Sequence, residues 1–301
     1  MAAISKVIII GAGAMGVPPA EKLSALSGVE VRILADEKRV ERYRCEGIFL
    51  NGRRMDFSYI TPDEEPDFVP QLVIIATKNG GLDGALELLR NRVKEKCIIL
   101  PLLNGISARD TISRKYPAAH ALYGLYLGHA SVRNGKNITF DGEGRILFGN
   151  AANEEILSAE VSAVKKLFDR AQIASEIPQD MLSAMWKKFV LNAGVNQTQA
   201  LFRADYGMVQ QSAEMQSFCM KLMGEAVAVA VKLNIPGTEQ MAADAMKLIM
   251  SMPPRTKTSM LQDIEAGRMT ELESFAGEIC RLGKILSVPT PANDMVMEKL
   301  A

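Results

Sequence analysis

The feature that most constrains the fold is an apolar run, KVIII, that leads directly into the glycine-rich turn GAGAMG near the N-terminus. Gly11, Gly13 and Gly16 stand in GxGxxG spacing. In such a turn the first glycine allows a tight bend, the second lets the backbone approach a pyrophosphate, and the third lets strand and helix pack closely. The pattern predicts a dinucleotide-binding turn, and the alternative is a tight turn that binds no ligand. The predicted cofactor-binding residues of this turn are Gly11, Ala12, Gly13, Ala14, Met15 and Gly16.

The first 115 residues alternate short β-rich runs with helical patterns, which is typical of a parallel sheet covered by helices on both faces. We therefore expect a doubly wound, Rossmann-type α/β domain. Between residues 120 and 149, β-rich pieces are separated by RNGKN and DGEGR, which predicts antiparallel hairpin strands added to that sheet. A helix near 154–170 and the apolar run QIASEI complete the domain. The predicted strands are KVIII, VEVRIL, LVIIAT and CIILPLL, and the first predicted helices are 15–27 and 81–94.

The character of the sequence changes after Pro178, where strand-like runs give way to long helical periodicities. A chain of 301 residues fits two domains of the usual size, about 100 to 200 residues each. We predict a dinucleotide-binding domain over residues 1–177 and an all-helical substrate and catalytic domain over 178–301. The predicted helices of the second domain are 179–200, 212–233, 238–250, 258–266, 271–286 and a terminal helix from 291.

The charge balance excludes some classes of partner. Lysine and arginine total 35, as do aspartate and glutamate, so we expect no nucleic-acid partner and no membrane partner. Four widely spaced cysteines, with His120 and His129 as the only histidines, argue against a structural zinc site or a disulfide framework. The first apolar run is too short for a signal peptide or a membrane span. We therefore expect a cytoplasmic protein that binds no metal. Its partner is expected to be a small molecule.

The type of dinucleotide depends on the end of the second predicted strand. Asp36 lies about 20 residues after the glycine turn, where an acidic residue commonly hydrogen-bonds the ribose 2′-hydroxyl of NAD and repels a 2′-phosphate. Lys38 and Arg39 follow closely, and either could instead reach the 2′-phosphate of NADP. Asp36 could also simply cap the helix that begins in EKRVERY. These residues do not decide whether the cofactor is NAD(H) or NADP(H).

A polar line runs through the otherwise apolar segment WKKFVLNAGVN of the second domain. Lys188, Asn192 and Asn196 are each four residues apart, so they share one face of a helix. A lysine among apolar residues such as Trp186 and Phe189 can have its pKa lowered toward neutrality, which suits a proton donor to a carbonyl oxygen. The alternative is that Lys188 extends to solvent. The two asparagines favour a ligand site, because buried amides need hydrogen-bond partners.

Other polar residues stand where predicted elements begin or end. Thr270 is predicted to cap a helix, which puts Glu271 at the first helical position, where its charge also favours the helix dipole. Ser259 lies at the start of an earlier short helix. Lys78 and Asn104 follow the strands LVIIAT and IILPLL, at the edge where doubly wound sheets bind ligands. A solvated lysine and an Asn-Gly turn are the alternatives at these two positions.

With these motifs the chain resembles the ketopantoate reductases (2-dehydropantoate 2-reductases). The resemblance covers nearly the whole length and rests on GAGAMG, ATK at 76–78, LNG at 103–105, WKKFVLNAGVN at 186–196 and TSMLQDIEAGRMTE at 258–271. It implies a Rossmann-type domain followed by a helical domain of the 6-phosphogluconate dehydrogenase C-terminal type. It further implies the NADPH-dependent reduction of 2-dehydropantoate to (R)-pantoate, a step toward pantothenate and coenzyme A. The sequence does not decide the oligomeric state, so a homodimer stays open.

The resemblance also implies a role for each polar residue. Lys188 would be the general acid that protonates the keto oxygen of the substrate. Glu271 would orient the substrate and hydrogen-bond its distal hydroxyl. The residues implied to line the substrate pocket are Asn192, Asn196, Ser259 and Asn104. The cofactor contacts expected outside the glycine turn are Asp36, Arg39, Lys78 and Asn104.

The chain departs from the family pattern at Asp36, where members commonly have an arginine that binds the 2′-phosphate of NADPH. A second interpretation is therefore an NADH-linked D-2-hydroxyacid dehydrogenase of the D-mandelate type, which acts on other 2-keto acids. A third is a catalytically silent nucleotide sensor. The presence of Lys188 and Glu271 disfavours the third, because a silent relative would be expected to lose its proton donor.

Overall fold

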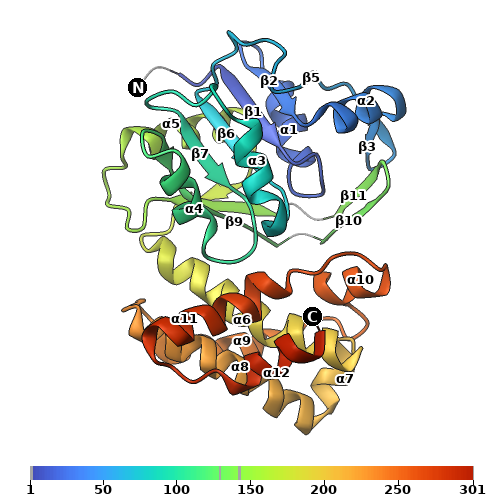
Figure 1. The fold of residues 1–301 in the computed structure, drawn as a ribbon, viewed down its shortest axis with the longest axis vertical. Helices are drawn as coiled ribbons and strands as arrows, with labels where there is room; N and C mark the ends of the chain where they lie inside the picture. The colour runs from blue at the N-terminus through green and yellow to red at the C-terminus, as the bar shows by residue number, and fades with distance from the viewer. Residues whose placement is uncertain (1–2, 129, 142–143, 301) are drawn as a thin grey trace. The chain divides into compact units, whose positions relative to one another are not determined.

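A computed structural model of the chain describes residues 3–128, 130–141 and 144–300 (Figure 1). His129 lies outside the described residues. The chain forms two compact units, Met1–Met181 and Leu182–Ala301. The first combines strands and helices and the second consists of helices, so the predicted fold class is confirmed.

The main sheet of the first unit has six parallel strands in the order β5-β2-β1-β6-β7-β8. After β1 the chain builds β2 and β5 on one side, then crosses to build β6, β7 and β8 on the other (Figure 1). The strand order therefore reverses between β1 and β6, as in other doubly wound folds. The strands are β1 (Lys6–Ile10), β2 (Glu30–Leu34), β5 (Tyr59–Ile60), β6 (Leu72–Ile75), β7 (Ile98–Pro101) and β8 (His120–Ala121).

Both faces of this sheet are covered, because successive strand residues point to opposite sides. Val7 and Ile9 of β1 belong to the apolar core beneath α1, α2 and α5, whereas Ile8 and Ile10 belong to the core beneath α3 and α4. A run of four consecutive buried apolar residues is what a strand covered on both faces requires. The helices are α1 (Val17–Ser24), α2 (Glu37–Glu46), α3 (Leu82–Leu88), α4 (Ala108–Lys115) and α5 (Ala159–Arg170), with a short 3₁₀ turn η1 (Asn79–Gly81).

The carboxyl ends of the four central strands lie at one level. Ile10 at the end of β1 is paired with Leu34 of β2 and with Ile75 of β6, and Ile75 is paired with Pro101 of β7. The loops that follow these strands therefore start from the same edge of the sheet. The glycine turn, Asp36, Lys78 and Asn104 all belong to those loops.

Residues 120–149 were predicted to add antiparallel hairpin strands to the main sheet, but only β8 joins that sheet, and it runs parallel to β7. Two further sheets form instead: β9, β12 and β13 make one, and β10, β11, β3 and β4 make the other. Local alternation identifies strands, but it does not identify a partner such as β3, which lies almost 90 residues earlier than β11. The additional strands are β3 (Ile48–Leu50), β4 (Arg53–Met55), β9 (Tyr123–Leu127), β10 (Ala130–Asn134), β11 (Asn137–Asp141), β12 (Arg145–Gly149) and β13 (Ser175–Glu176).

The second unit is built around α6, a helix of 22 residues whose central part is almost entirely buried. Each predicted helix is present, and the short α7 was not predicted because six residues carry little periodicity. The helices are α6 (Met181–Phe202), α7 (Tyr206–Gln211), α8 (Ala213–Lys232), η2 (Thr238–Gln240), α9 (Met241–Ser251), α10 (Ser259–Glu265), α11 (Glu278–Leu286) and α12 (Pro291–Leu300).

A π-helical turn, η3 (Glu273–Gly277), runs directly into α11. Such turns hold one residue more per hydrogen-bonded ring than an α-helix and often lie at functional sites. The predicted helix over 271–286 is therefore present, but its first part is not a regular α-helix.

All four cysteines are free thiols. Among the described residues, no helix combines the length and the apolar composition needed to cross a membrane.

Candidate functional site

The glycine turn has the close backbone packing that its spacing predicts. Gly11 has a φ of +102°, and a Cβ placed there would come within 2.5 Å of the Ala76 carbonyl group. A Cβ on Gly16 would lie 2.1 Å from the Gly11 carbonyl oxygen. A Cβ on Gly13, by contrast, would meet no atom within 4 Å. Gly11 and Gly16 are therefore required by the fold, whereas Gly13 leaves open space that fits the close approach of a dinucleotide phosphate.

The first turn of α1 has few free N–H groups. The N–H groups of Gly16 and Val17 both donate to the Gly13 carbonyl oxygen, at 3.2 and 3.0 Å. Pro18 and Pro19 follow and have no N–H. A phosphate at this helix end must therefore find donors other than the amides of the first helical turn.

Asp36 forms the N-cap of α2 and is paired with Arg39. One carboxylate oxygen of Asp36 accepts a hydrogen bond from the Arg39 backbone N–H at 2.8 Å, and the other contacts the Arg39 guanidinium at 2.6 Å. Asp36 therefore caps the helix that begins in EKRVERY, which was one of the interpretations of this residue. The pair also places a carboxylate and a guanidinium together at the end of β2, where a cofactor ribose would lie in a fold of this class.

The loops after β6 and β7 are joined by a hydrogen bond. The Asn79 side-chain amide donates to the Asn104 carbonyl oxygen. Lys78, the residue before Asn79, is exposed, and Asn104 is half-buried. Because Gly11 packs against Ala76 at the start of the β6 loop, these two loops and the glycine turn form one cluster at the sheet edge.

The predicted polar line is present on α6 of the second unit. Lys188 and Asn192 are half-buried, and Asn196 is only 5 % exposed. Trp186, Phe189 and Val190 around the lysine are buried. The line therefore leads from a half-buried lysine to a buried asparagine within an apolar helix.

Lys188 and Glu271 interact electrostatically within the second unit. Burial lowers the pKa of the Lys188 ammonium from 10.5 to about 8, and the Glu271 carboxylate acts in the opposite direction by stabilising the cation. Glu271 itself is 8 % exposed. A lysine with this pKa remains largely protonated at neutral pH and gives up its proton far more readily than an ordinary lysine.

Aromatic packing fixes the position of Glu271 relative to α6. Phe275 in the π-helical turn packs on Phe189, the residue after Lys188, with ring centroids 6.2 Å apart. Phe189 in turn makes an edge contact with Trp186 at 5.2 Å. All three rings are buried, and each such pair contributes about 0.5–1.5 kcal/mol beyond its burial. The aromatic cluster thus links the segment of the carboxylate to the helix of the lysine.

Glu271 lies just before the helix rather than at its first position, so that detail of the prediction was wrong. The Thr270 hydroxyl accepts a hydrogen bond from the Leu272 N–H at 3.4 Å, and the Glu271 carbonyl oxygen accepts from the Ser274 N–H at 2.9 Å. The preceding loop is held by the Arg268–Asp263 ion pair at 2.9 Å. Glu271 is therefore held in a buried bend between two fixed segments.

Ser259 is exposed and is the first residue of α10. The preceding residue, Thr258, is buried, and its N–H donates to the Gln199 side-chain oxygen on α6 at 2.8 Å. The start of α10 is thereby tied to the helix that carries Lys188.

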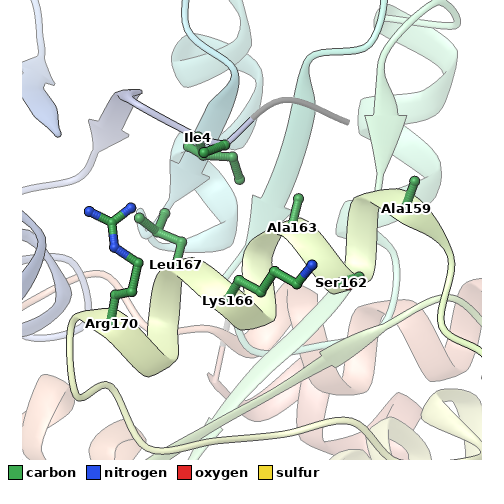
Figure 2. Close-up of a pocket in the computed structure, with 8 residues that line it drawn as sticks. Ile4, Ala159, Ser162, Ala163, Lys166, Leu167 and Arg170 are labelled. Atoms are coloured by element: carbon green, nitrogen blue, oxygen red, sulfur yellow. The ribbon is translucent and has the colours of Figure 1, made fainter. Parts of the chain in front are cut away.

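The structure also contains a surface hollow of about 320 Å³ in the first unit. Figure 2 shows Ala163 and Leu167 of α5 pointing toward Ile4 across it, with Lys166 and Arg170 along its border. None of the predicted site residues lines this hollow. It lies between residues 3–4, which precede β1, and α5.

Sequence reasoning missed several residues that support these positions. Asn79 contacts a residue 25 positions later, Gln199 contacts one 59 positions later, and Arg133 reaches the glycine turn from 121 positions away. No local spacing predicts contacts of this kind. Phe275 could have been recognised as a core residue from the apolar periodicity of its helix.

Two family models together match most of the chain. The model described as "Ketopantoate reductase PanE/ApbA" matches residues 7–153, and "Ketopantoate reductase PanE/ApbA C terminal" matches residues 180–301. The 2-dehydropantoate 2-reductase of Pyrococcus horikoshii is 24% identical over 295 residues, which cover 96% of this chain and 94% of that protein.

Solved structures with the same fold include two kinds of dehydrogenase. D-mandelate dehydrogenase in a ternary structure with NADH and anilino(oxo)acetate has a TM-score of 0.84 at 23% identity, covering 97% of this chain and 96% of that one. The 2-dehydropantoate 2-reductase of Methylococcus capsulatus has a TM-score of 0.82 at 25% identity, covering 97% and 94%.

Proposed function

The chain belongs to the ketopantoate reductase PanE/ApbA family, and we propose that it reduces 2-dehydropantoate to (R)-pantoate with a nicotinamide cofactor. More generally, the proposed reaction converts the ketone of a 2-keto acid to a hydroxyl group. The family is one of NAD(P)-dependent oxidoreductases, and the glycine turn of the first unit has the open backbone that such a cofactor requires.

The interaction of Lys188 with Glu271 is the observation that supports the proposal most. An ammonium with a pKa of about 8, beside a buried carboxylate, is suited to donate a proton near neutral pH. A binding protein without catalysis has no need of a lysine whose charge is destabilised in this way. The pair therefore favours an enzyme over a nucleotide sensor.

Each residue has a defined task in the proposed mechanism. A bound nicotinamide cofactor would supply the hydride, and the Lys188 ammonium would protonate the keto oxygen as negative charge develops there. Glu271 keeps the ammonium protonated before the reaction and accepts a hydrogen bond from a substrate hydroxyl. Asn192 and Asn196 donate hydrogen bonds to the substrate from the same face of α6, with Ser259 as a further contact.

Asp36 favours a second candidate, an NADH-linked D-2-hydroxyacid dehydrogenase of the D-mandelate type. A carboxylate at the end of β2 hydrogen-bonds a ribose hydroxyl and repels a 2′-phosphate, so it favours NADH. The similar D-mandelate dehydrogenase structure contains NADH. Arg39 is the residue of this loop that would bind the additional phosphate of NADPH.

Steady-state rates with two substrates and two cofactors test the proposal. 2-Dehydropantoate and benzoylformate are each assayed with NADH and with NADPH. Turnover of 2-dehydropantoate at the higher kcat/KM supports the first candidate, and a clear preference for benzoylformate supports the second. Absence of turnover with all four combinations would refute a reductase of this type. Whether the protein forms a homodimer, which the sequence leaves open, is tested separately by the sedimentation of the purified protein.

Replacing Asp36 should shift the cofactor preference. Asp36→Ala removes the carboxylate and releases Arg39 from its ion pair, so we expect the ratio of kcat/KM for NADPH to that for NADH to rise by roughly tenfold, the effect of about one charge-assisted hydrogen bond. The exposed neighbour Glu37 provides the control, Glu37→Ala, which removes the same charge from the first turn of α2. An equal ratio in both variants would show that Asp36 does not select the cofactor.

Replacing Glu271 should move the pH dependence of reduction. The Lys188 ammonium is the proton donor, so kcat/KM is expected to fall as the pH rises through about 8. Glu271 raises the pKa of Lys188, and its removal in Glu271→Gln lowers that pKa further. The descending limb of the pH profile should therefore move to lower pH. Glu273→Gln, which neutralises an exposed carboxylate two residues later, should leave the limb in place.

A further inference from the structure

Arg133 on β10 brings a guanidinium group to the glycine turn. Its Nη1 donates to the Ala12 carbonyl oxygen at 2.9 Å, and its Nε donates to the Gly135 carbonyl oxygen at 2.9 Å. The side chain is half-buried. The hairpin of β10 and β11 lies beside β3 and is not part of the main sheet (Figure 1). Arg133 is thus a contact between this separate sheet and the turn that follows β1.

Both acceptors of Arg133 are carbonyl oxygens, and no carboxylate of the described residues forms an ion pair with it. Other arginines of the same unit are paired with carboxylates, such as Arg53 with Glu21 and Arg32 with Glu65. A guanidinium has five N–H donors in a planar arrangement, so Arg133 keeps donors for a further acceptor. The Arg133 guanidinium therefore brings a positive charge and further N–H donors to the glycine turn.

The first turn of α1 itself offers few N–H donors to a phosphate. Gly16 and Val17 direct their N–H groups to the Gly13 carbonyl oxygen, and the two prolines that follow have none. The phosphate groups that usually lie at this helix end therefore lose part of their usual set of donors. A guanidinium is well suited to replace them, because its hydrogen bonds to phosphate are charge-assisted and can be bidentate.

We propose that Arg133 is a cofactor-binding residue that contacts the pyrophosphate of the dinucleotide and replaces amide donors missing from the first turn of α1. This rests on the proposed function in that it requires a nicotinamide dinucleotide in the first unit. With Arg133, the cofactor site would include the β10–β11 hairpin, which is not part of the main sheet.

Binding measurements on the whole protein test this role without using activity. The dissociation constants of NADH, NADPH, ADP-ribose and adenosine are compared for the wild type, Arg133→Met, Arg133→Lys and the control Arg145→Met. Arg145 is an exposed arginine of the same unit, paired with Glu176 at 3.1 Å, so its removal changes the net charge equally. We expect Arg133→Met to weaken NADH and ADP-ribose binding roughly tenfold or more. Adenosine, which lacks phosphate, should bind all four proteins alike, and the lysine variant should retain part of the affinity.

Chemical modification of the wild type covers the case in which a variant fails to fold. Phenylglyoxal modifies arginine side chains, and mass spectrometry reports the extent at Arg133. ADP-ribose at saturation should protect Arg133, whereas adenosine should not. Unchanged modification with ADP-ribose, or equal ADP-ribose affinity in Arg133→Met and Arg145→Met, would overturn the inference while the proposed function stands. Wild-type protein that binds neither NADH nor NADPH would overturn both.

Discussion

Lys188→Ala is expected to reduce the turnover of 2-keto acid by about 10²-fold or more, the usual contribution of a general acid. The alanine variant has no group in that place that can protonate the keto oxygen, so water must do so. The effect should appear in kcat as well as in kcat/KM, because the proton is transferred in the transition state. Rates at saturating cofactor, measured below pH 8, give the comparison under conditions in which the wild-type ammonium is protonated.

Lys187→Ala is the matched control, because Lys187 is the exposed neighbour of the half-buried Lys188. The control removes the same charge from the same turn of α6 and should retain nearly full activity. Circular dichroism and thermal unfolding establish that both variants are folded. A Lys188→Ala protein that is folded and turns over at the wild-type rate would refute the assignment of the general acid.

Arg92→Met is expected to destabilise the first unit by about 3 kcal/mol or more. Arg92 is 2 % exposed, and its guanidinium donates to carbonyl oxygens of the loop before β6. Methionine fills the space of the aliphatic stem but leaves those buried carbonyl groups without their donor. The acceptors are the backbone carbonyls of Thr61, Pro62, Glu64, Glu65 and Phe68.

Arg90→Met provides the comparison for this effect. Arg90 lies two residues earlier, is 57 % exposed and forms a surface ion pair with Asp63 at 3.0 Å. Exposed ion pairs of this kind contribute about 0–1 kcal/mol, so the control should unfold close to the wild type. Urea unfolding followed by circular dichroism measures both. Equal unfolding midpoints for the two variants would show that the Arg92 hydrogen bonds do not hold this loop.

The elements that were predicted correctly are those whose signals are local. The run KVIII followed by glycines at fixed spacing predicts β1, the turn and α1 without reference to the rest of the chain. The polar line on α6 was predicted in the same way, because four-residue spacing alone puts Lys188, Asn192 and Asn196 on one face. Local patterns of this kind also place the four central strands.

The features that were missed depend on contacts between distant segments. β11 pairs with β3, where Ile138 lies opposite Leu50, and no pattern within either strand indicates the other. Arg92 and Arg133 resemble ordinary charged residues in the sequence, since only the folded chain shows the carbonyl oxygens they contact. The lowered pKa of Lys188 was proposed from its apolar neighbours, but the opposing effect of Glu271 arises from a residue 83 positions later.

The π-helical turn limits how the protein could be engineered for heat resistance. Deleting one residue from Glu273–Gly277 would close an ordinary α-helical turn, which is the more favourable backbone arrangement. The deletion would also rotate the segments on either side by about 100° about the helix axis. With Phe275 held against Phe189, a deletion before Phe275 would rotate Glu271 and turn the carboxylate away from its lysine, and a deletion after Phe275 would rotate α11 instead. A thermostabilised variant should therefore keep this irregular turn and gain its stability at exposed helical surfaces instead.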